Sequence, residues 1–343
     1  MQARRRLRIL VPAALFLALT ALTQIGGIAW LLGCATARLP GLRRRPAPVR
    51  IAAGLLCGVL LYAALTLAVV PPLAAAMGRA RLPCGSDGGA LVAATPLNCA
   101  LNRSYVRPAV LALLEALAAE AARRFPGSRL TVLEGSFPFV DGFPMLPHLS
   151  HRDGRKVDLA YFYRDAADGH AIPGGSPSPL GYFVYERPGP GETPSCAGRW
   201  TPLRWDLPWL QPDPPRWVID PERTAWMVGW LTARPEVTRL FIEPYLAQRL
   251  AVTGGKVRFQ GCRAARHDDH LHIEVMGPGG GRADLALRRA QDGLERGAHA
   301  LRLVLERVEG RGLRDLGGMG SKEVLRVLAP QTGTPPSAVR RAT

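Results

Sequence analysis

The sequence lacks every common nucleic-acid-binding module, although it is strongly basic. Its 343 residues include 44 Lys and Arg against 27 Asp and Glu, which gives a net charge of +17, and only three of the basic residues are lysines. There is no zinc finger, no RNP-type motif and no basic region leading into heptads, which argues against DNA or RNA as a partner. The charge suits an anionic membrane surface or an anionic cell-wall polymer instead.

Cysteine is scarce and never forms a CxxC pair, so zinc ligation by cysteine is disfavoured. Of the six cysteines, Cys34 and Cys57 lie in apolar runs and are expected to be small buried residues. The other four form an even set in the polar part of the chain, which suits two disulfides and an oxidising compartment. We predict the pairs Cys84–Cys99 and Cys196–Cys262. Four reduced thiols remain the alternative, because spacing alone does not establish a bridge.

Charged residues are missing from two long runs near the N-terminus, at about 9–37 and 51–77. Each run exceeds the roughly 20 residues that span a bilayer core, and both are too long for the apolar part of a cleaved signal peptide. The sequence therefore predicts two transmembrane helices and a multi-pass protein of the cytoplasmic membrane. The arginines before the first run and those between the runs nearly balance, so they leave the orientation open. The cysteines favour a domain on the periplasmic or extracytoplasmic side.

We divide the chain into a membrane anchor at 1–78, a domain at 79–280, and a C-terminal segment at 281–343. Within the domain, apolar residues at helical spacing predict a helix over 105–125. Short alternating segments predict strands, including 156–163, 237–242 and 270–275. The stretch 173–215, dense in Gly, Pro and Trp, is expected to be a long irregular insertion. Together these predict an α+β fold with a small central antiparallel sheet and flanking helices. The last segment is expected to hold a basic helix and a poorly ordered tail.

Five of the seven histidines fall in two clusters, and both clusters also contain aspartate. The first is His148-Leu-Ser-His151-Arg-Asp-Gly-Arg-Lys-Val-Asp158, and the second is His267-Asp-Asp-His270-Leu-His272. Neutral imidazole and carboxylate are zinc ligands, and a catalytic zinc site keeps three protein ligands and one open position. His270 and His272 lie two apart on a predicted strand, so both face one side. The sequence thus predicts a site that binds one zinc ion.

The two clusters together resemble the metallopeptidases grouped as lysostaphin, D-Ala-D-Ala peptidases and sonic hedgehog. The pattern His151, Gly154, Asp158, followed far downstream by His270-Leu-His272, carries the resemblance, and the additional His267 is most similar to the penicillin-insensitive murein endopeptidases. The resemblance covers about 130–275. It implies that His151, Asp158 and His272 bind the metal, while His270 and His267 act as base or stabilise the oxyanion. Asp269 is ranked below them, because on a strand it would point away from His270.

The resemblance implies zinc-dependent hydrolysis of a peptide cross-link amide bond in peptidoglycan. Two alternatives stay open: a D-Ala-D-Ala carboxypeptidase or dipeptidase, and a catalytically silent zinc-stabilised module that binds the cell wall. Other residues have two readings. His148 either lines the site or lies on a loop surface, and Glu274 either orients a ligand or faces solvent. The tryptophans of and after the insertion either wall a groove or pack: Trp200, Trp205, Trp209 and Trp217.

Overall fold

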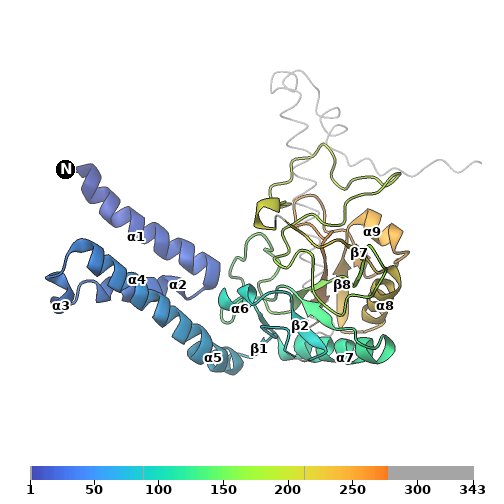
Figure 1. Ribbon diagram of the computed structural model, residues 1–343, viewed down its shortest axis with the longest axis horizontal. Helices are drawn as coiled ribbons and strands as arrows, with labels where there is room; N and C mark the ends of the chain where they lie inside the picture. Colours follow the sequence, from blue (N-terminus) through green and yellow to red (C-terminus); the bar gives the residue numbers. More distant parts are fainter. Residues whose placement is uncertain (1, 88, 212, 277–343) are drawn as a thin grey trace, which may run out of the picture. The chain divides into compact units, whose positions relative to one another are not determined.

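The computed structural model describes residues 2–87, 89–211 and 213–276. All of the described residues belong to one compact unit, which extends to residue 278. The helix and tail predicted for 281–343 therefore lie outside the described residues. The predicted α+β class is confirmed, because helices and several sheets share this unit (Figure 1).

The central sheet has six strands in the order β2-β4-β5-β10-β8-β9. Their bounds are Leu91–Ala93, Leu130–Val132, Lys156–Ala160, His270–Val275, Val237–Phe241 and Val257–Arg258. The four middle strands pair antiparallel, as predicted, but β2 pairs parallel to β4 and β9 parallel to β8. The sheet is therefore mixed. The edge strands are β2 and β9. Each is separated from its parallel neighbour by a stretch of chain that contains a helix, which lets the two strands run in the same direction.

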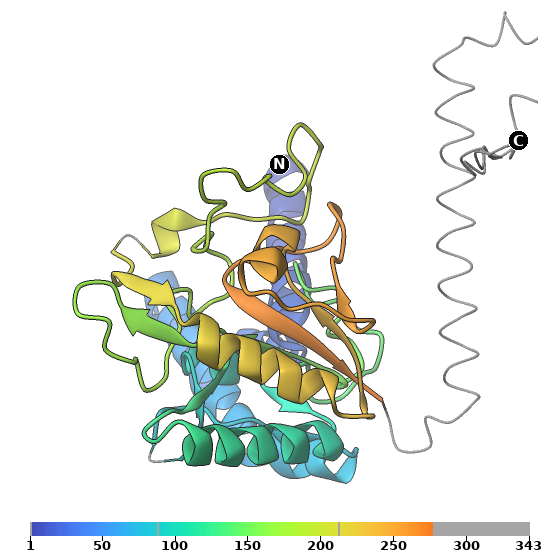
Figure 2. The same ribbon diagram turned by 90° about the vertical axis from the view of Figure 1, so that its right-hand side faces the viewer.

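Two helices cover one face of this sheet and lie beside each other: α7 (Pro108–Arg124) and α8 (Pro221–Thr232) (Figure 2). Helix α7 buries Val110, Leu114 and Leu117 at helical spacing. It begins at Pro108, later than predicted, because Tyr105–Val106 form strand β3, which pairs with β1 (Ala80–Arg81). Helix α8 is capped by Asp220, whose side chain accepts a hydrogen bond from the Arg223 amide.

Alternation along the strands gives the sheet one apolar and one polar face. Val157, Leu159, Leu271 and Ile273 belong to the same buried core as the apolar side chains of α7 and α8. Successive side chains of a strand point to opposite faces, so Asp158, His270 and His272 lie on the other face. The sheet therefore presents the predicted site residues away from the two covering helices.

The rest of the domain consists of short elements and irregular chain. Strands β6 (Tyr163–Asp165) and β7 (Trp217–Ile219) form a separate pair, and helices α6 (Leu97–Ala100) and α9 (Pro244–Arg249) are one to two turns long. Among the described residues of the predicted insertion at 173–215, the 3₁₀ turn Pro208–Leu210 is the one regular element. Both predicted disulfides are present, Cys84–Cys99 and Cys196–Cys262. The second one ties the insertion to the segment that precedes β10.

The predicted first membrane span is wrong as a single helix. Residues 9–37 form the last part of α1 (Gln2–Thr23) and the shorter α2 (Gly26–Thr36). The chain turns between them at Gln24, whose φ is 64°, and Gly26 and Gly27 follow. A residue in the left-handed conformation ends an α-helix. After this turn, the Thr23 hydroxyl accepts a hydrogen bond of 2.8 Å from the backbone amide of Gly26. The apolar parts of α1 and α2 are each shorter than a bilayer core requires.

The second apolar run is one continuous helix from Ala47 to Ala76, made of α4 (Ala47–Ala64), a π-helical stretch (Leu65–Val69) and α5 (Val70–Ala76). Among the described residues, it is the one helix that is long and apolar enough to cross a membrane. A multi-pass arrangement is thus not supported by helix length. Helix α3 (Pro40–Arg43) connects α2 to α4, and α2 packs on α4 where a Cβ on Gly33 would lie 2.5 Å from the Gly54 carbonyl oxygen. Small residues allow such a close helix approach.

The disulfides generate a prediction about topology. Because disulfides persist in oxidising compartments, residues 79–276 should lie outside the cytoplasm. A phosphatase reporter that folds only after export, fused after Met276, should be active, whereas a fluorescent protein that folds only in the cytoplasm should be dark at the same position. The opposite pair of signals would place the domain in the cytoplasm and remove the basis for the disulfides.

Candidate metal centre

The antiparallel pairing of β5 with β10 brings the two sequence clusters together. Asp158 lies directly opposite His272 in the register, and the Asp158 Oδ1 atom is 2.8 Å from His272 Nδ1. His151 enters from the loop before β5, with its Nε2 atom 3.1 Å from the same carboxylate oxygen and 2.9 Å from His272 Nδ1. All three side chains are almost completely buried. The structure thus gathers the three predicted ligands around one point.

A glycine and a carbonyl group fix the position of His151. Gly154 has a φ of +73°, and a Cβ there would collide with the guanidinium group of Arg79, so this loop needs glycine. The Nδ1 atom of His151 lies 2.7 Å from the Gly135 carbonyl oxygen. Since a carbonyl accepts, the hydrogen on this ring belongs to Nδ1, and Nε2 is free to bind a metal. The glycine of the sequence motif therefore serves the geometry of the loop.

A second group of possible ligands uses the other oxygen of Asp158. His148 Nδ1 lies 3.0 Å and His270 Nε2 lies 3.7 Å from Asp158 Oδ2. Within residues 2–276, two groups of buried side chains could hold a metal ion: His151, Asp158 and His272, and His148, Asp158 and His270. His148 is buried, so the loop-surface reading is excluded and it lines the site.

The chemistry of these residues fits a metal ion. Within the described residues the buried His270 Nε2 atom, which lies 3.7 Å from Asp158 Oδ2, has no hydrogen-bond partner. An unpaired buried polar atom is costly, and a cation beside it would remove much of that cost. Donor atoms of a tetrahedral zinc are about 3.3 Å apart, given bonds of about 2.0–2.1 Å. The separations of 2.8–3.1 Å among His151, Asp158 and His272 come close to this geometry.

The charges of the site follow from burial and from the facing groups. Burial alone would raise the pKa of Asp158, but His151, His270 and His148 hold it well below its usual value, so it is a carboxylate. Burial lowers the pKa of His272 to about 4, which leaves this ring neutral at pH 7, as a metal ligand must be. Burial, with His270 and His272 nearby, also holds the pKa of His267 well below its usual value.

Asp269 does not point away from His270, contrary to the sequence-based expectation. Its Oδ1 atom lies 2.5 Å from His270 Nδ1, and its Oδ2 atom accepts a hydrogen bond of 2.6 Å from the Ser178 hydroxyl. Strand β10 begins at His270, so strand alternation does not apply to the residue before it. Burial alone would lower the pKa of His270, but Asp158 and Asp269 outweigh it and raise the pKa. Asp269 thus orients the His270 ring and directs its Nε2 atom toward Asp158.

A buried row of charges behind His148 could not be found from sequence motifs. His148 Nδ1 is 2.7 Å from Glu134 Oε2, and Glu134 Oε1 is 2.7 Å from Arg103 Nε. Burial alone would lower the pKa of His148, but Asp158 and Glu134 raise it to about 10. Tyr182, from the insertion, packs its ring 5.4 Å from that of His148. Glu134 and Arg103 lie outside both histidine clusters in the sequence, so no motif indicates that they belong to the site.

His267 lies beside the predicted ligands without belonging to either candidate set. Its ring centroid is 5.1 Å from that of His270 and 5.5 Å from that of His272. Its backbone amide donates to Glu243 Oε1 at 3.2 Å, and the same oxygen pairs with Arg204 of the insertion at 2.6 Å. The insertion thus helps to position the segment that carries His267.

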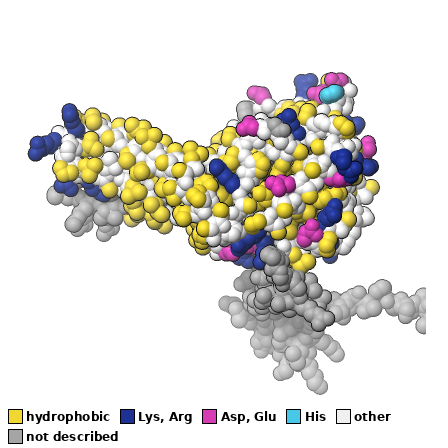
Figure 3. Space-filling view, turned by 90° about the horizontal axis from the view of Figure 1, so that it is seen from below, with side chains coloured by type: hydrophobic (Ala, Val, Ile, Leu, Met, Phe, Trp, Pro, Cys, Tyr) yellow, Lys and Arg dark blue, Asp and Glu magenta, His cyan; other side chains and the backbone are white. Residues whose placement is uncertain are grey.

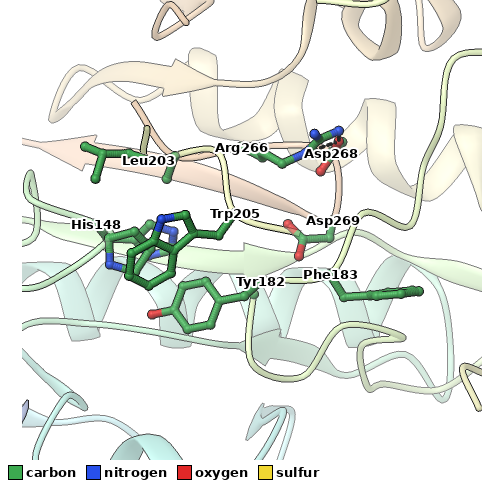
Figure 4. A pocket seen from close by; sticks show the side chains of 11 residues that line it. His148, Tyr182, Phe183, Leu203, Trp205, Arg266, Asp268 and Asp269 are labelled. Atoms are coloured by element: carbon green, nitrogen blue, oxygen red, sulfur yellow. Dashed lines mark hydrogen bonds and ion pairs between the residues drawn. The ribbon is translucent and has the colours of Figure 1, made fainter. Parts of the chain in front are cut away.

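Of the four tryptophans, one borders a pocket, one packs against the core and two are largely exposed. Trp205 borders a small pocket with His148 and Tyr182, where the three rings gather opposite the carboxylate of Asp269 (Figure 4). Trp217 packs against the core, whereas Trp200 and Trp209 are 78% and 73% exposed.

Glu274 forms ion pairs with Lys156 and Arg239 rather than facing solvent freely. A cavity of about 160 Å³ adjoins the site and is bordered by His148, His267, His272, Leu203 and Arg263, among others.

Comparison with protein-family models and with curated proteins finds no match to this chain. The arrangement of the site itself therefore has to carry the functional assignment.

The two candidate ligand sets make different predictions for metal content. We expect His151→Ala, Asp158→Asn and His272→Ala each to lower zinc affinity by more than the roughly 10–100-fold that loss of a ligand's hydrogen-bond partner causes. His148→Ala and His270→Ala should retain the ion, since their ring atoms are not within the first set. Elemental analysis after dialysis against a weak chelator measures the content. Retention in His272→Ala together with loss in His270→Ala would reverse the two sets.

Proposed function

We propose that the protein is a zinc peptidase that hydrolyses a peptide cross-link amide bond in peptidoglycan, in the manner of the penicillin-insensitive murein endopeptidases that its motifs resemble. The proposal rests on one observation, namely that a possible set of metal ligands lies beside a histidine whose ring is oriented by a carboxylate. Two imidazoles and a carboxylate face one point, and beside them His270 is oriented by Asp269. A site that only stabilised the fold would have no need for a second, separately oriented pair of imidazoles.

Zinc bound by His151, Asp158 and His272 would polarise the scissile carbonyl and lower the pKa of a water molecule. Because Asp269 accepts from Nδ1 of His270, the Nε2 atom of that ring is the one that exchanges protons. A bound zinc ion would offset the charge of Asp158, which is the main group that raises the pKa of His270, and so would favour the neutral ring. In the proposed reaction the neutral His270 Nε2 takes a proton from the attacking water and passes it to the leaving amine. His267 is neutral and buried, so it can donate a ring N–H to the oxyanion of the tetrahedral intermediate.

The proposed place of action is the outer side of the cytoplasmic membrane. The two disulfides support an extracytoplasmic domain, and the apolar helix Ala47–Ala76 supports attachment to a membrane. The net charge of +17 suits an anionic wall polymer at that location.

One feature favours a D-Ala-D-Ala carboxypeptidase or dipeptidase as the second candidate. Arg263 borders the cavity that also contains His267 and His272, and no carboxylate of residues 2–276 pairs with it. A guanidinium beside the reacting groups that has no carboxylate partner within residues 2–276 suits a substrate with a terminal carboxylate. The two candidates differ in their products, because an endopeptidase splits cross-linked dimers whereas a carboxypeptidase releases a terminal residue.

Muropeptide digestion tests the reaction. The full chain in detergent with zinc should convert cross-linked muropeptide dimers to monomers, and chelator should stop the conversion. Product masses read by mass spectrometry identify the bond. Release of single amino acids from monomers would favour the carboxypeptidase. Intact substrates in the presence of zinc-loaded protein would leave only the silent binding module.

Variants of the proposed proton-transfer pair test the mechanism. His270→Ala should retain zinc and lower kcat by roughly 10²–10⁴-fold, the usual contribution of general acid–base catalysis. Asp269→Asn should also lower kcat with zinc retained, because the amide no longer holds the ring in the same tautomer. Asp168→Asn is the matched control, since Asp168 is exposed and remote from the site. Normal turnover by Asp269→Asn would show that the contact with His270 has no role in the reaction.

A further inference from the structure

A second cavity lies in the N-terminal helical segment, between α2 and α4. It has a volume of about 300 Å³ and is bordered at one end by Arg38, Arg43 and Arg50, and elsewhere by apolar residues that include Trp30, Ile51 and Leu55. This volume lies at the lower end of the range for small-molecule sites. Its lining combines a cationic end with an apolar wall.

The packing of the two helices explains why the cavity lies beside their contact. Helices α2 and α4 approach most closely at Gly33, Gly54 and Gly58, where added side chains would meet the backbone of the opposite helix. The Thr36 hydroxyl and the Cys57 thiol, 3.2 Å apart, join the same two helices. Beyond this contact the chain leaves α2, passes through the short helix α3 and returns at α4. The cavity therefore lies where α2 ends and α4 begins.

The cationic end has no anion of its own within the segment. The first acidic residue of the sequence is Asp87, so residues 1–86 contain no carboxylate side chain. No ion pair within residues 2–276 includes Arg38, Arg43 or Arg50. Arg50 is half-buried, whereas Arg38 and Arg43 are exposed, and all three residues border the cavity. Like charges that border one space repel each other, although water weakens this repulsion between exposed groups, and an anion between them would remove it.

The surroundings indicate what kind of anion fits. Figure 3 shows Lys and Arg side chains at the end of the helical segment where Figure 1 places α3, while hydrophobic side chains cover its length. Helix α4 begins the apolar helix Ala47–Ala76, and its exposed leucines and valines suit a lipid environment. A molecule with a phosphate at one end and hydrocarbon at the other matches both parts of the lining. Basic pockets between membrane helices bind lipid headgroups in this manner.

We propose that the cavity between α2 and α4 binds the headgroup of an anionic membrane phospholipid. The guanidinium groups of Arg38, Arg43 and Arg50 hold the phosphate, and Trp30, Ile51 and Leu55 contact the first part of an acyl chain. This site is separate from the metal centre and does not depend on the proposed hydrolysis. A nucleotide or a free phosphate would leave the apolar wall unused.

Native mass spectrometry of the full chain, purified in detergent and stripped of lipid, tests the proposal. The probes are dioleoyl-phosphatidylglycerol and dioleoyl-phosphatidylcholine, added separately. We expect one phosphatidylglycerol to be retained per chain under conditions that remove phosphatidylcholine. Equal retention of both lipids would overturn the proposal, because it would leave only apolar contacts. Displacement of the lipid by millimolar inorganic phosphate would instead identify a free-phosphate site and would overturn the lipid assignment.

Two charge-matched variants separate the cavity from general attraction. Arg43→Gln/Arg50→Gln removes two arginines of the cavity, and Arg44→Gln/Arg45→Gln removes two of the same connection that do not border it. The cavity variant should bind phosphatidylglycerol at least about 30-fold more weakly, because each lost contact is a charge-assisted hydrogen bond. The matched variant should change by less than about 3-fold, as expected for surface charges. Equal losses in both would overturn the site in favour of diffuse attraction.

A substitution that leaves the charges intact covers the case in which the cavity variant fails to fold. Leu55→Trp fills the apolar wall while Arg38, Arg43 and Arg50 remain. It should lower phosphatidylglycerol retention to the level of phosphatidylcholine, with zinc content and both disulfides unchanged as the check of folding. Undiminished retention in Leu55→Trp would overturn the proposal, because the lipid would then be bound elsewhere.

Discussion

The register between β5 and β10 is the constraint on which the site depends. It places Asp158 opposite His272, and each oxygen of that one carboxylate faces its own pair of histidines. A slip of one residue would turn Leu159 or Leu271 toward the site and bury Asp158 among the helices α7 and α8. The apolar core and the polar site thus specify the same register. The sheet can hold a charged cluster because its opposite face is fully covered.

Burial of so many ionisable groups requires partners, and the insertion supplies a large share of them. Ser178 donates to Asp269, Tyr182 packs on His148, and Arg204 pairs with Glu243 beneath the His267 amide. The disulfide Cys196–Cys262 holds the same stretch against the segment before β10. The long irregular stretch is therefore part of the site's support rather than a separate cover. The contacts made by Ser178, Tyr182 and Arg204 each need a different local direction of the backbone, which a regular helix or strand would not provide.

Sequence patterns indicated the metal site and the disulfides. They missed residues whose role depends on contacts that only the fold creates. The histidine and aspartate clusters marked a metal site, and the resemblance to a known family singled out His151, Asp158 and His272, which the structure gathers as one of two possible ligand groups. The even number of cysteines in the polar part of the chain indicated two disulfides, and the favoured pairs are the ones present. The contact of Asp269 with His270 was missed because it depends on where β10 begins. Glu134 and Arg103 are ordinary residues until the fold places them behind His148. The turn at Gln24 was missed because hydropathy averages over a single polar residue and does not detect a left-handed backbone.

The helical segment contacts both the loop that carries His148 and His151 and the chain just before β3. The Gln24 side chain accepts the amide of Phe139 at 3.2 Å, and Asn102 donates to Thr66 at 3.2 Å. Arg79, three residues after α5, is buried beneath Gly154 and pairs with Asp141 of the same loop. Residue 154 has a φ of +73° and lies against that guanidinium, and glycine accommodates both conditions. The position of His151 therefore depends on where the helix Ala47–Ala76 delivers Arg79. The long apolar helix and the candidate metal site are in this way joined through one buried arginine.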